Sequence, residues 1–148
     1  MSTFWKNWLM AWCGGVALFG VVLTTGAFPA TDGLMRWLLG VLGGAPAEMT
    51  PPLRFALAVM GPVSIGWALT FAAAFRAAIM LGDAGAPVWR LTTAGVLVWF
   101  VVDSSLSVAT GFGLNVAPNV VLLAGYLLPL IRTGVLSGRP LSATGVHG

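Results

Sequence analysis

The sequence has very little charge. Of its 148 residues, only 7% are Asp, Glu, Lys or Arg, whereas 58% are hydrophobic. A soluble globular domain carries about a quarter charged residues. A chain so poor in charge and so rich in apolar side chains has lipid as its main solvent. We therefore predict an integral membrane protein, and the length suits a single transmembrane domain over residues 1–148.

The sequence also lacks the side chains of redox, haem and zinc chemistry. Its single cysteine, Cys13, excludes an internal disulfide and a Cys-x-x-Cys redox pair. The bulky Trp12 before that cysteine argues against lipidation, so a buried, inert thiol is favoured. The single histidine, His147, is next to last, and no haem or zinc site can be built from imidazoles. We expect no cofactor and no bound metal.

The excess of basic over acidic residues does not indicate a nucleic-acid partner. The net charge is +3, but the seven basic residues are scattered one at a time and form no patch. Their positions suit the topology of a membrane protein instead. We therefore expect the lipid bilayer, and no nucleic acid, as the main partner.

Four continuous apolar segments are long enough to cross a bilayer as helices, which takes about 20 residues each. They cover about residues 8–24, 53–79, 91–110 and 116–136. None of them alternates with period two, which argues against strands of a membrane barrel. The predicted fold is all-α, an integral membrane four-helix bundle.

The first segment has an alternative interpretation as a cleaved signal peptide. Lys6 precedes the apolar run, and residues 25–27 read Thr-Gly-Ala, which resembles a cleavage site. However, the run exceeds a usual signal core, and Trp5, Trp8 and Trp12 recur at helical spacing as an interfacial anchor would. A retained first helix is favoured.

Between the first two spans, residues 32–43 predict a short amphipathic helix. Five apolar residues follow the i, i+3, i+4, i+7, i+8 spacing of one helix face: Leu34, Trp37, Leu38, Val41 and Leu42. Thr31 or Asp32 can cap the start, and Gly43, Gly44 and Pro46 end the pattern. The helix is too short to span. It lies either on the outer leaflet or on the bundle as a lid, and the sequence leaves both open.

The distribution of basic residues predicts the orientation. With the N-terminus inside, the cytoplasmic side holds Asp83 and five basic residues, which are Lys6, Arg76, Arg90, Arg132 and Arg139. The other side holds two basic and two acidic residues, which are Arg36, Arg54, Asp32 and Glu48. We therefore predict that both termini are cytoplasmic.

One acid, Asp103, lies inside the third span, in WFVVDSSLSVATG. It follows Arg90 by 13 residues, or about 20 Å at 1.5 Å per helical residue. That depth is inside a hydrocarbon core about 30 Å thick. An acid there costs about 2.5–3.5 kcal/mol on insertion scales, so it should face the bundle interior. Its own helix supplies the rest of an intramembrane polar site: Trp99, Ser104, Ser107 and Thr110.

Several residues outside the third span are possible partners of this polar site. Pro62 in the second span frees the carbonyl of Ala58, a natural acceptor for a protonated Asp103. The other candidates are Ser64 one turn deeper, Arg54 as the only nearby base, and the amides of Asn115 and Asn119. We expect Asp103 to be mostly neutral and hydrogen-bonded inside the bundle.

Two functions fit these features. An intramembrane acid indicates either a carrier of small solutes, protons or ions, or a hydrogen bond that fixes the bundle or a partner subunit. A carrier usually has more polar groups at the midplane than this chain supplies. Catalysis is not expected, because the serines near Asp103 have no intramembrane histidine or lysine beside them. The favoured function is a non-catalytic accessory or scaffold protein that packs with itself or with a larger membrane complex.

The stretch LVWFVVDSSLSVATGFGLNVAPNVVLLAGYLLPL resembles the small four-helix bacterial inner-membrane proteins of unknown function. Those proteins share an aromatic–Asp–Ser signature late in the third span and an Asn in the following hairpin. The resemblance implies a bacterial inner membrane and no known activity. Small multidrug transporters and fluoride channels also have four spans, but this chain has no acid in its first helix and no paired phenylalanine box.

Overall fold

The fold is that of a computed structural model, which describes residues 1–137; Arg139 and His147 lie outside the described residues. Every regular element in this range is helical, which confirms the all-α prediction. The elements in chain order are α1 Thr3–Thr25, α2 Gly33–Gly43, α3 Pro51–Leu81, η1 Gly82–Gly85, α4 Ala86–Ala109, η2 Gly113–Asn115 and α5 Val116–Thr133.

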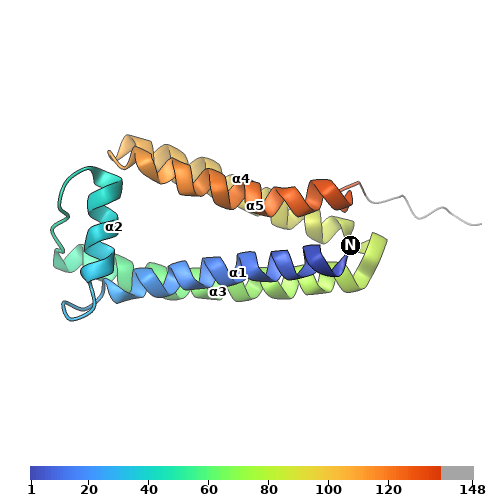
Figure 1. The fold of residues 1–148 in the computed structure, drawn as a ribbon, viewed down its shortest axis with the longest axis horizontal. Coiled ribbons are helices and arrows are strands. Elements are labelled where there is room, and N and C mark those ends of the chain that lie inside the picture. The colour runs from blue at the N-terminus through green and yellow to red at the C-terminus, as the bar shows by residue number, and fades with distance from the viewer. Residues whose placement is uncertain (138–148) are drawn as a thin grey trace, which may run out of the picture.

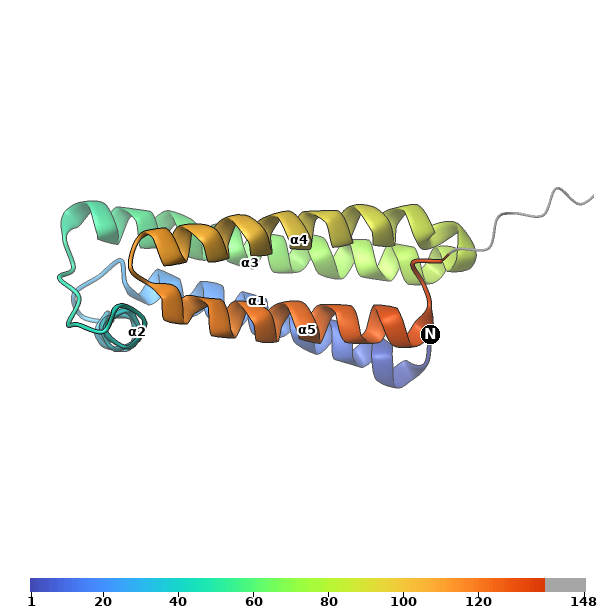
Figure 2. The same cartoon turned by 90° about the horizontal axis from the view of Figure 1, so that it is seen from above.

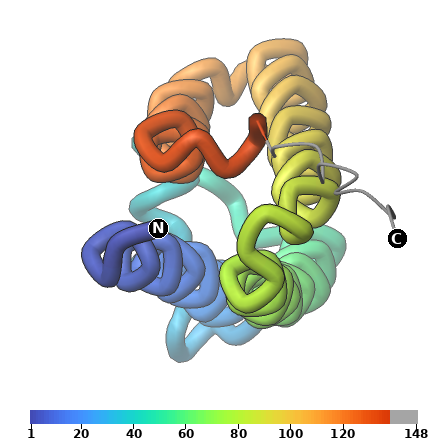
Figure 3. The backbone as a smooth tube through the Cα atoms, turned by 90° about the vertical axis from the view of Figure 1, so that its right-hand side faces the viewer, coloured from blue at the N-terminus to red at the C-terminus, as the bar shows by residue number. Residues whose placement is uncertain are grey.

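The four long helices run side by side, and α2 lies across one end of them (Figure 1). Seen end-on, they occupy the corners of a square in the order α1, α3, α4, α5 (Figure 3). Each long helix is antiparallel to the one before it, so the N-terminus lies at the end opposite α2 (Figure 2). The bundle therefore has an α2 end and an N-terminal end.

Three helical segments within residues 1–137 are long and apolar enough to cross a membrane. They are Thr3–Thr25, Pro51–Ala109 and Gly113–Thr133. The middle segment is 59 residues long because α3, η1 and α4 follow one another without a break, and the chain turns back at η1. The sequence predicts two separate spans here, and the structure has two antiparallel helices joined by one helical turn.

Proline and glycine set the helix ends. Pro51 and Pro52 occupy the first positions of α3, where their missing N–H groups need no partner. The helix α5 ends at Thr133, because Gly134 adopts the left-handed conformation with φ 65°. The helix α5 thus ends three residues before residue 136, the predicted end of the fourth span.

The largest core cluster is aromatic and joins all four long helices. Phe75 of α3 stacks against Trp89 of α4 at 5.4 Å and against Tyr126 of α5 at 5.7 Å between ring centroids. Leu9 and Cys13 of α1 complete the contact and are buried. Aromatic rings bury more area per residue than aliphatic side chains do, so this cluster holds the two layers of the bundle together.

The helices α1 and α3 are held by backbone proximity. A Cβ atom built on Gly20 would lie 2.7 Å from the carbonyl oxygen of Gly61, closer than real Cβ atoms approach. Glycine at both positions is therefore what lets the two helix backbones meet. Contacts of this kind are common between membrane helices, because lipid gives no hydrophobic drive to association.

The helix α2 packs on the bundle with one face and leaves the other face open. Met35 is 2% exposed and joins a small cluster with Leu23, Met49 and Leu57. Leu34, Trp37 and Val41 are exposed. The periodic stripe predicted from the sequence is thus mainly the outer face, while Met35 and Leu39 point inward. Since Met35 and Leu39 are as apolar as the residues of the predicted stripe, spacing alone did not show which face packs.

Candidate functional site

The acid of α4, Asp103, is bound by two amides. Asp103 lies late in α4, and the chain then reverses through Gly111, whose φ is 86°. The reversal sets the start of α5 beside the end of α4. As a result, Asp103 Oδ2 accepts hydrogen bonds from Nδ2 of Asn115 at 3.0 Å and from Nδ2 of Asn119 at 2.5 Å.

Two serine hydroxyls complete this group of side chains. The Asn115 amide also donates to Ser107 Oγ at 3.0 Å, and the Asn119 amide also donates to Ser104 Oγ at 3.2 Å. Each amide nitrogen carries two hydrogens, so each can serve the carboxylate and one hydroxyl at the same time. We call Asp103, Ser104, Ser107, Asn115 and Asn119 the carboxylate–amide cluster.

Within residues 1–137, the candidate partners on α3 do not bond to Asp103, whereas the two candidate amides do. Pro62 is exposed, and no hydrogen bond within residues 1–137 joins Asp103 to the Ala58 carbonyl. Ser64 donates to Met60 O of its own helix at 2.9 Å. The short α4–α5 hairpin explains why Asp103 does not bond to α3. It places two amides beside Asp103, and these amides donate its hydrogen bonds. Asp103 is consequently an acceptor in this structure.

Two further residues predicted at this site do not join the carboxylate–amide cluster. Thr110 is exposed and donates to Leu106 O of its own helix at 2.8 Å. Trp99 is half-buried, packs against the aromatic core cluster and lines a groove beside Asp103. Trp99 therefore neighbours the acid without bonding to it.

Arg54 is paired with a different acid, at the α2 end. Its Nη2 lies 2.7 Å from Asp32 Oδ2, and its Nη1 donates to Gly26 O at 3.2 Å. Arg36 Nε lies 2.9 Å from Asp32 Oδ1. Hydrogen bonds from Arg36 and then from Arg54 hold the pKa of Asp32 below its usual value. Asp32 precedes α2 but makes no side-chain cap bond there, so the predicted capping role is wrong.

Two tryptophans tie α1 to α5 through hydrogen bonds that sequence reasoning missed. Trp8 Nε1 donates to Gly125 O at 2.8 Å, and Trp12 Nε1 donates to Leu122 O at 2.9 Å. The Gly125 carbonyl is available because the residue four positions later is Pro129, which has no N–H. A proline in a span is therefore the sequence signal that could have found the acceptor.

A second polar contact joins α4 to α5 nearer the N-terminal end. The buried Tyr126 hydroxyl lies 2.9 Å from Thr93 Oγ1 and 3.2 Å from Thr92 Oγ1. Both threonines also bond to carbonyls of their own helix. This hairpin is thus tied by polar side chains at two levels.

Comparisons with protein-family models, with curated proteins and with solved structures found no match to this chain. The resemblance to small four-helix inner-membrane proteins stays a prediction. Within residues 1–137, no group of three or more His, Cys, Asp and Glu side chains lies close enough to hold a metal ion. The chemistry available at the carboxylate–amide cluster is hydrogen bonding and the attraction of a positive charge.

Proposed function

We propose that this chain is a four-span protein of a bacterial inner membrane that acts as a non-catalytic accessory or scaffold protein. In this proposal α1, α3, α4 and α5 cross the bilayer. The axis of α2 is nearly perpendicular to theirs (Figures 1 and 2), which suits a helix lying in the plane of the outer leaflet. The exposed side chains of α2, Leu34, Trp37 and Val41, then meet lipid.

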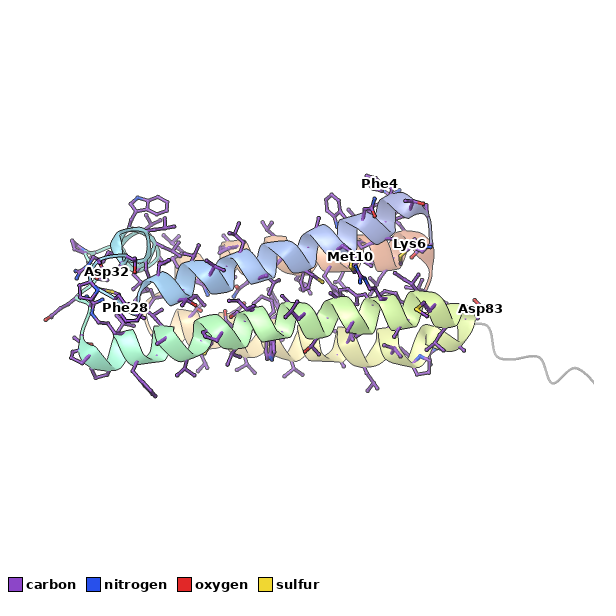
Figure 4. All side chains as sticks on the ribbon, turned by 90° about the horizontal axis from the view of Figure 1, so that it is seen from below. Phe4, Lys6, Met10, Phe28, Asp32 and Asp83 are labelled. Carbon is purple, nitrogen blue, oxygen red and sulfur yellow. The ribbon has the colours of Figure 1, made fainter. Side chains whose placement is uncertain are left out.

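The charged residues support an orientation with both ends cytoplasmic. Lys6 and Asp83 lie at the N-terminal end of the bundle, and Asp32 lies at the α2 end (Figure 4). The long helices place Arg76, Arg90 and Arg132 at the N-terminal end as well. Both arginines described at the α2 end, Arg36 and Arg54, are paired with Asp32. The excess positive charge therefore gathers at one end, as expected of a cytoplasmic face.

Cysteine labelling tests this orientation. With Cys13 replaced by alanine, Ala47→Cys should react with a membrane-impermeant maleimide on intact cells, because Ala47 lies in the connection at the α2 end. Asp83→Cys, at the opposite end, should react only after lysis. The reverse pattern would contradict the orientation.

One exposed surface of α1 supports the proposal of a scaffold. Ala11, Gly14, Gly15 and Leu18 follow i, i+3, i+4, i+7 spacing, and all four are exposed. A Cβ built on Gly14 or Gly15 would meet nothing within 4 Å. Ala11 and Gly15 form a small-xxx-small pair, the spacing at which a second helix can approach closely. We call these four residues the α1 strip.

The carboxylate–amide cluster supports a structural role for Asp103. Its Oδ2 atom is bonded by two amides of the same hairpin, whose remaining hydrogens go to serines. A general acid or base needs a substrate within reach and a partner that moves its proton. In residues 1–137, the hydrogen-bond partners of Asp103 are both amides, which neither accept nor release protons near neutral pH.

Size analysis after gentle extraction from native membranes tests the scaffold. The wild type should run as a larger assembly, with itself or with other proteins. Gly15→Leu fills the α1 strip and should reduce the assembly to the single chain. Gly66→Leu is the matched control, since Gly66 of α3 is equally open and lies off the strip. A wild type that is already monomeric, or an equal response of both variants, would argue against the proposal.

A further inference from the structure

A groove between α3 and α4 lies beside the carboxylate–amide cluster. It has a volume of about 570 Å³, and its lining residues are Trp67, Ala94, Gly95, Val98, Trp99, Val102, Asp103 and Leu106. Asp103 is the only charged member of this set. Val98, Val102 and Leu106 are exposed, so the groove opens sideways, toward the surface that the proposed topology places in lipid.

Asp103 lines this groove, and one of its two carboxylate oxygens has no hydrogen-bond partner within residues 1–137. Both amide bonds go to Oδ2. Oδ1 accepts no hydrogen bond from residues 1–137, and it is not among the fully buried polar atoms. A carboxylate oxygen has room for two donors or for one close positive charge. The cluster thus fixes the carboxylate by one oxygen and leaves the other accessible.

The charged residues on the neighbouring helices do not compete for this oxygen. On α3, Arg54 is bound to Asp32, and Arg76 belongs to the N-terminal end. On α4, Arg90 donates to Leu136 O at 3.1 Å, far along the helix from Asp103. On α5, Arg132 lies in the last turn. A positive charge at Asp103 Oδ1 must therefore come from outside the described chain.

We propose that this groove binds a lipophilic organic cation, an ammonium or phosphonium centre carried on an apolar body. Asp103 supplies the opposite charge, and Trp67 and Trp99 supply aromatic faces that attract organic cations. A bare metal ion does not fit, because Ca²⁺ and Mg²⁺ require about six or more oxygen ligands and this groove offers one carboxylate. A neutral apolar molecule would leave Asp103 Oδ1 without a partner.

The floor of the groove has room for the apolar body. A Cβ built on Gly95 would meet nothing within 4 Å, so the space above this glycine is unfilled. Trp67 is 49% exposed and forms the α3 wall. A larger side chain at position 95 would occupy the groove without touching the carboxylate–amide cluster. This separation allows the site to be blocked while Asp103 and its amides stay in place.

The test measures equilibrium binding of tetraphenylphosphonium to the full chain in lipid nanodiscs, with empty nanodiscs as the blank. Tetraphenylborate has the same shape and the opposite charge. The wild type should retain at least tenfold more of the cation than of the borate. Asp103→Asn keeps the hydrogen-bonding partners and should remove this preference. Gly95→Leu should weaken cation binding about tenfold, while Gly33→Leu, at an equally open glycine of α2 outside the groove and the α1 strip, should not.

The outcomes separate this inference from the scaffold proposal. Equal retention of cation and borate by the wild type would overturn the inference, and so would unchanged cation binding by Gly95→Leu. If Asp103→Asn fails to fold, Gly95→Leu and Trp67→Leu still test cation binding, because both residues line the groove outside the carboxylate–amide cluster. Failure of the α1 strip to bind a partner would not affect this measurement, which needs only the chain in a bilayer.

Discussion

The pair α1–α3 and the pair α4–α5 join antiparallel helices in different ways. Between α1 and α3, Gly20 and Gly61 let the backbones meet, and no side-chain hydrogen bond within residues 1–137 crosses between the two helices themselves. Between α4 and α5, side chains cross at two levels, at Asp103 near the α2 end and at Tyr126 nearer the N-terminus.

This difference shows what each kind of contact requires of its surroundings. Glycine contacts gain their energy from close packing, so they tolerate no added volume. Polar contacts in a dry interior tolerate small changes of shape, but they are sensitive to the loss of one partner, because the other is left unsatisfied. The two pairs should therefore fail under different substitutions.

Added volume should break the α1–α3 pair first. A Cβ on Gly61 would press against Thr24 and lie 2.7 Å from the Gly20 carbonyl oxygen. We expect Gly61→Val to lower the free energy of unfolding by about 3 kcal/mol, the upper end for overpacking. The measurement is reversible unfolding in mixed detergent micelles. Gly15→Val on α1 has open space around it and should change stability by less than about 0.5 kcal/mol; equal losses would show that the contact is not tight.

Loss of an acceptor should break the α4–α5 pair. Asp103→Leu leaves the amides of Asn115 and Asn119 without their shared oxygen. The expected loss is about 0.6–2 kcal/mol, the range for hydrogen bonds between membrane helices. Asp103→Asn keeps an accepting oxygen and should lose less. Ser105→Ala, at an exposed neighbouring hydroxyl, is the control; a Leu variant as stable as this control would remove the structural role of the cluster.

A double-mutant cycle should show how the two pairs are linked. Trp8→Phe removes the donor to Gly125 O, and we expect a loss of about 0.6 kcal/mol. In a Pro129→Ala background the alanine N–H can serve that carbonyl itself, so Trp8→Phe should then lose clearly less. Additive effects of the two substitutions in unfolding measurements would mean that Pro129 does not create the acceptor.

The smallest effect is local to α2 and depends on pH. Arg36 and Arg54 lower the folded-state pKa of Asp32, whereas the pKa of a free Asp is about 3.9. The stabilisation by Asp32 is therefore complete above about pH 4 and is lost as pH falls through the lower folded pKa. Hydrogen exchange of residues 33–43, corrected for intrinsic rates, should be constant from about pH 7 to 5 and rise below about 4. Asp32→Asn should exchange faster at neutral pH and show no such step.

The helices were predictable from the sequence because their apolar runs are long and continuous, and α2 was predictable from its spacing and its terminal glycines. Asp103, Ser104, Ser107, Asn115 and Asn119 were all candidates, and the structure brings these five together. Their pairing was harder to predict. The position of Pro62 favoured a partner on α3. The length and turn of the α4–α5 hairpin decided the partner instead. Hydropathy carries no information about which residues of α4 and α5 lie opposite each other.

The contacts of Arg54 and Trp8 could not be predicted from the sequence, for a related reason. Arg54 meets Asp32 across 22 positions, and Trp8 meets Gly125 across 117. Such contacts depend on which helices become neighbours and on their rotation. The square order α1, α3, α4, α5 places α5 beside α1 (Figure 3).

The hydrogen bond of the Trp8 indole also sets the order in which helix contacts can form during synthesis. Its acceptor is 117 positions later in the chain, and a ribosome adding about 5–20 residues per second supplies it about 6–23 seconds after Trp8 itself. Gly61, which packs against Gly20 of α1, is synthesised much sooner. During synthesis, α1 and α3 can therefore close as a finished pair while α1 waits with an indole donor that water or a lipid headgroup must satisfy. Arrival of α5 displaces that temporary partner, so α5 completes the contacts of α1.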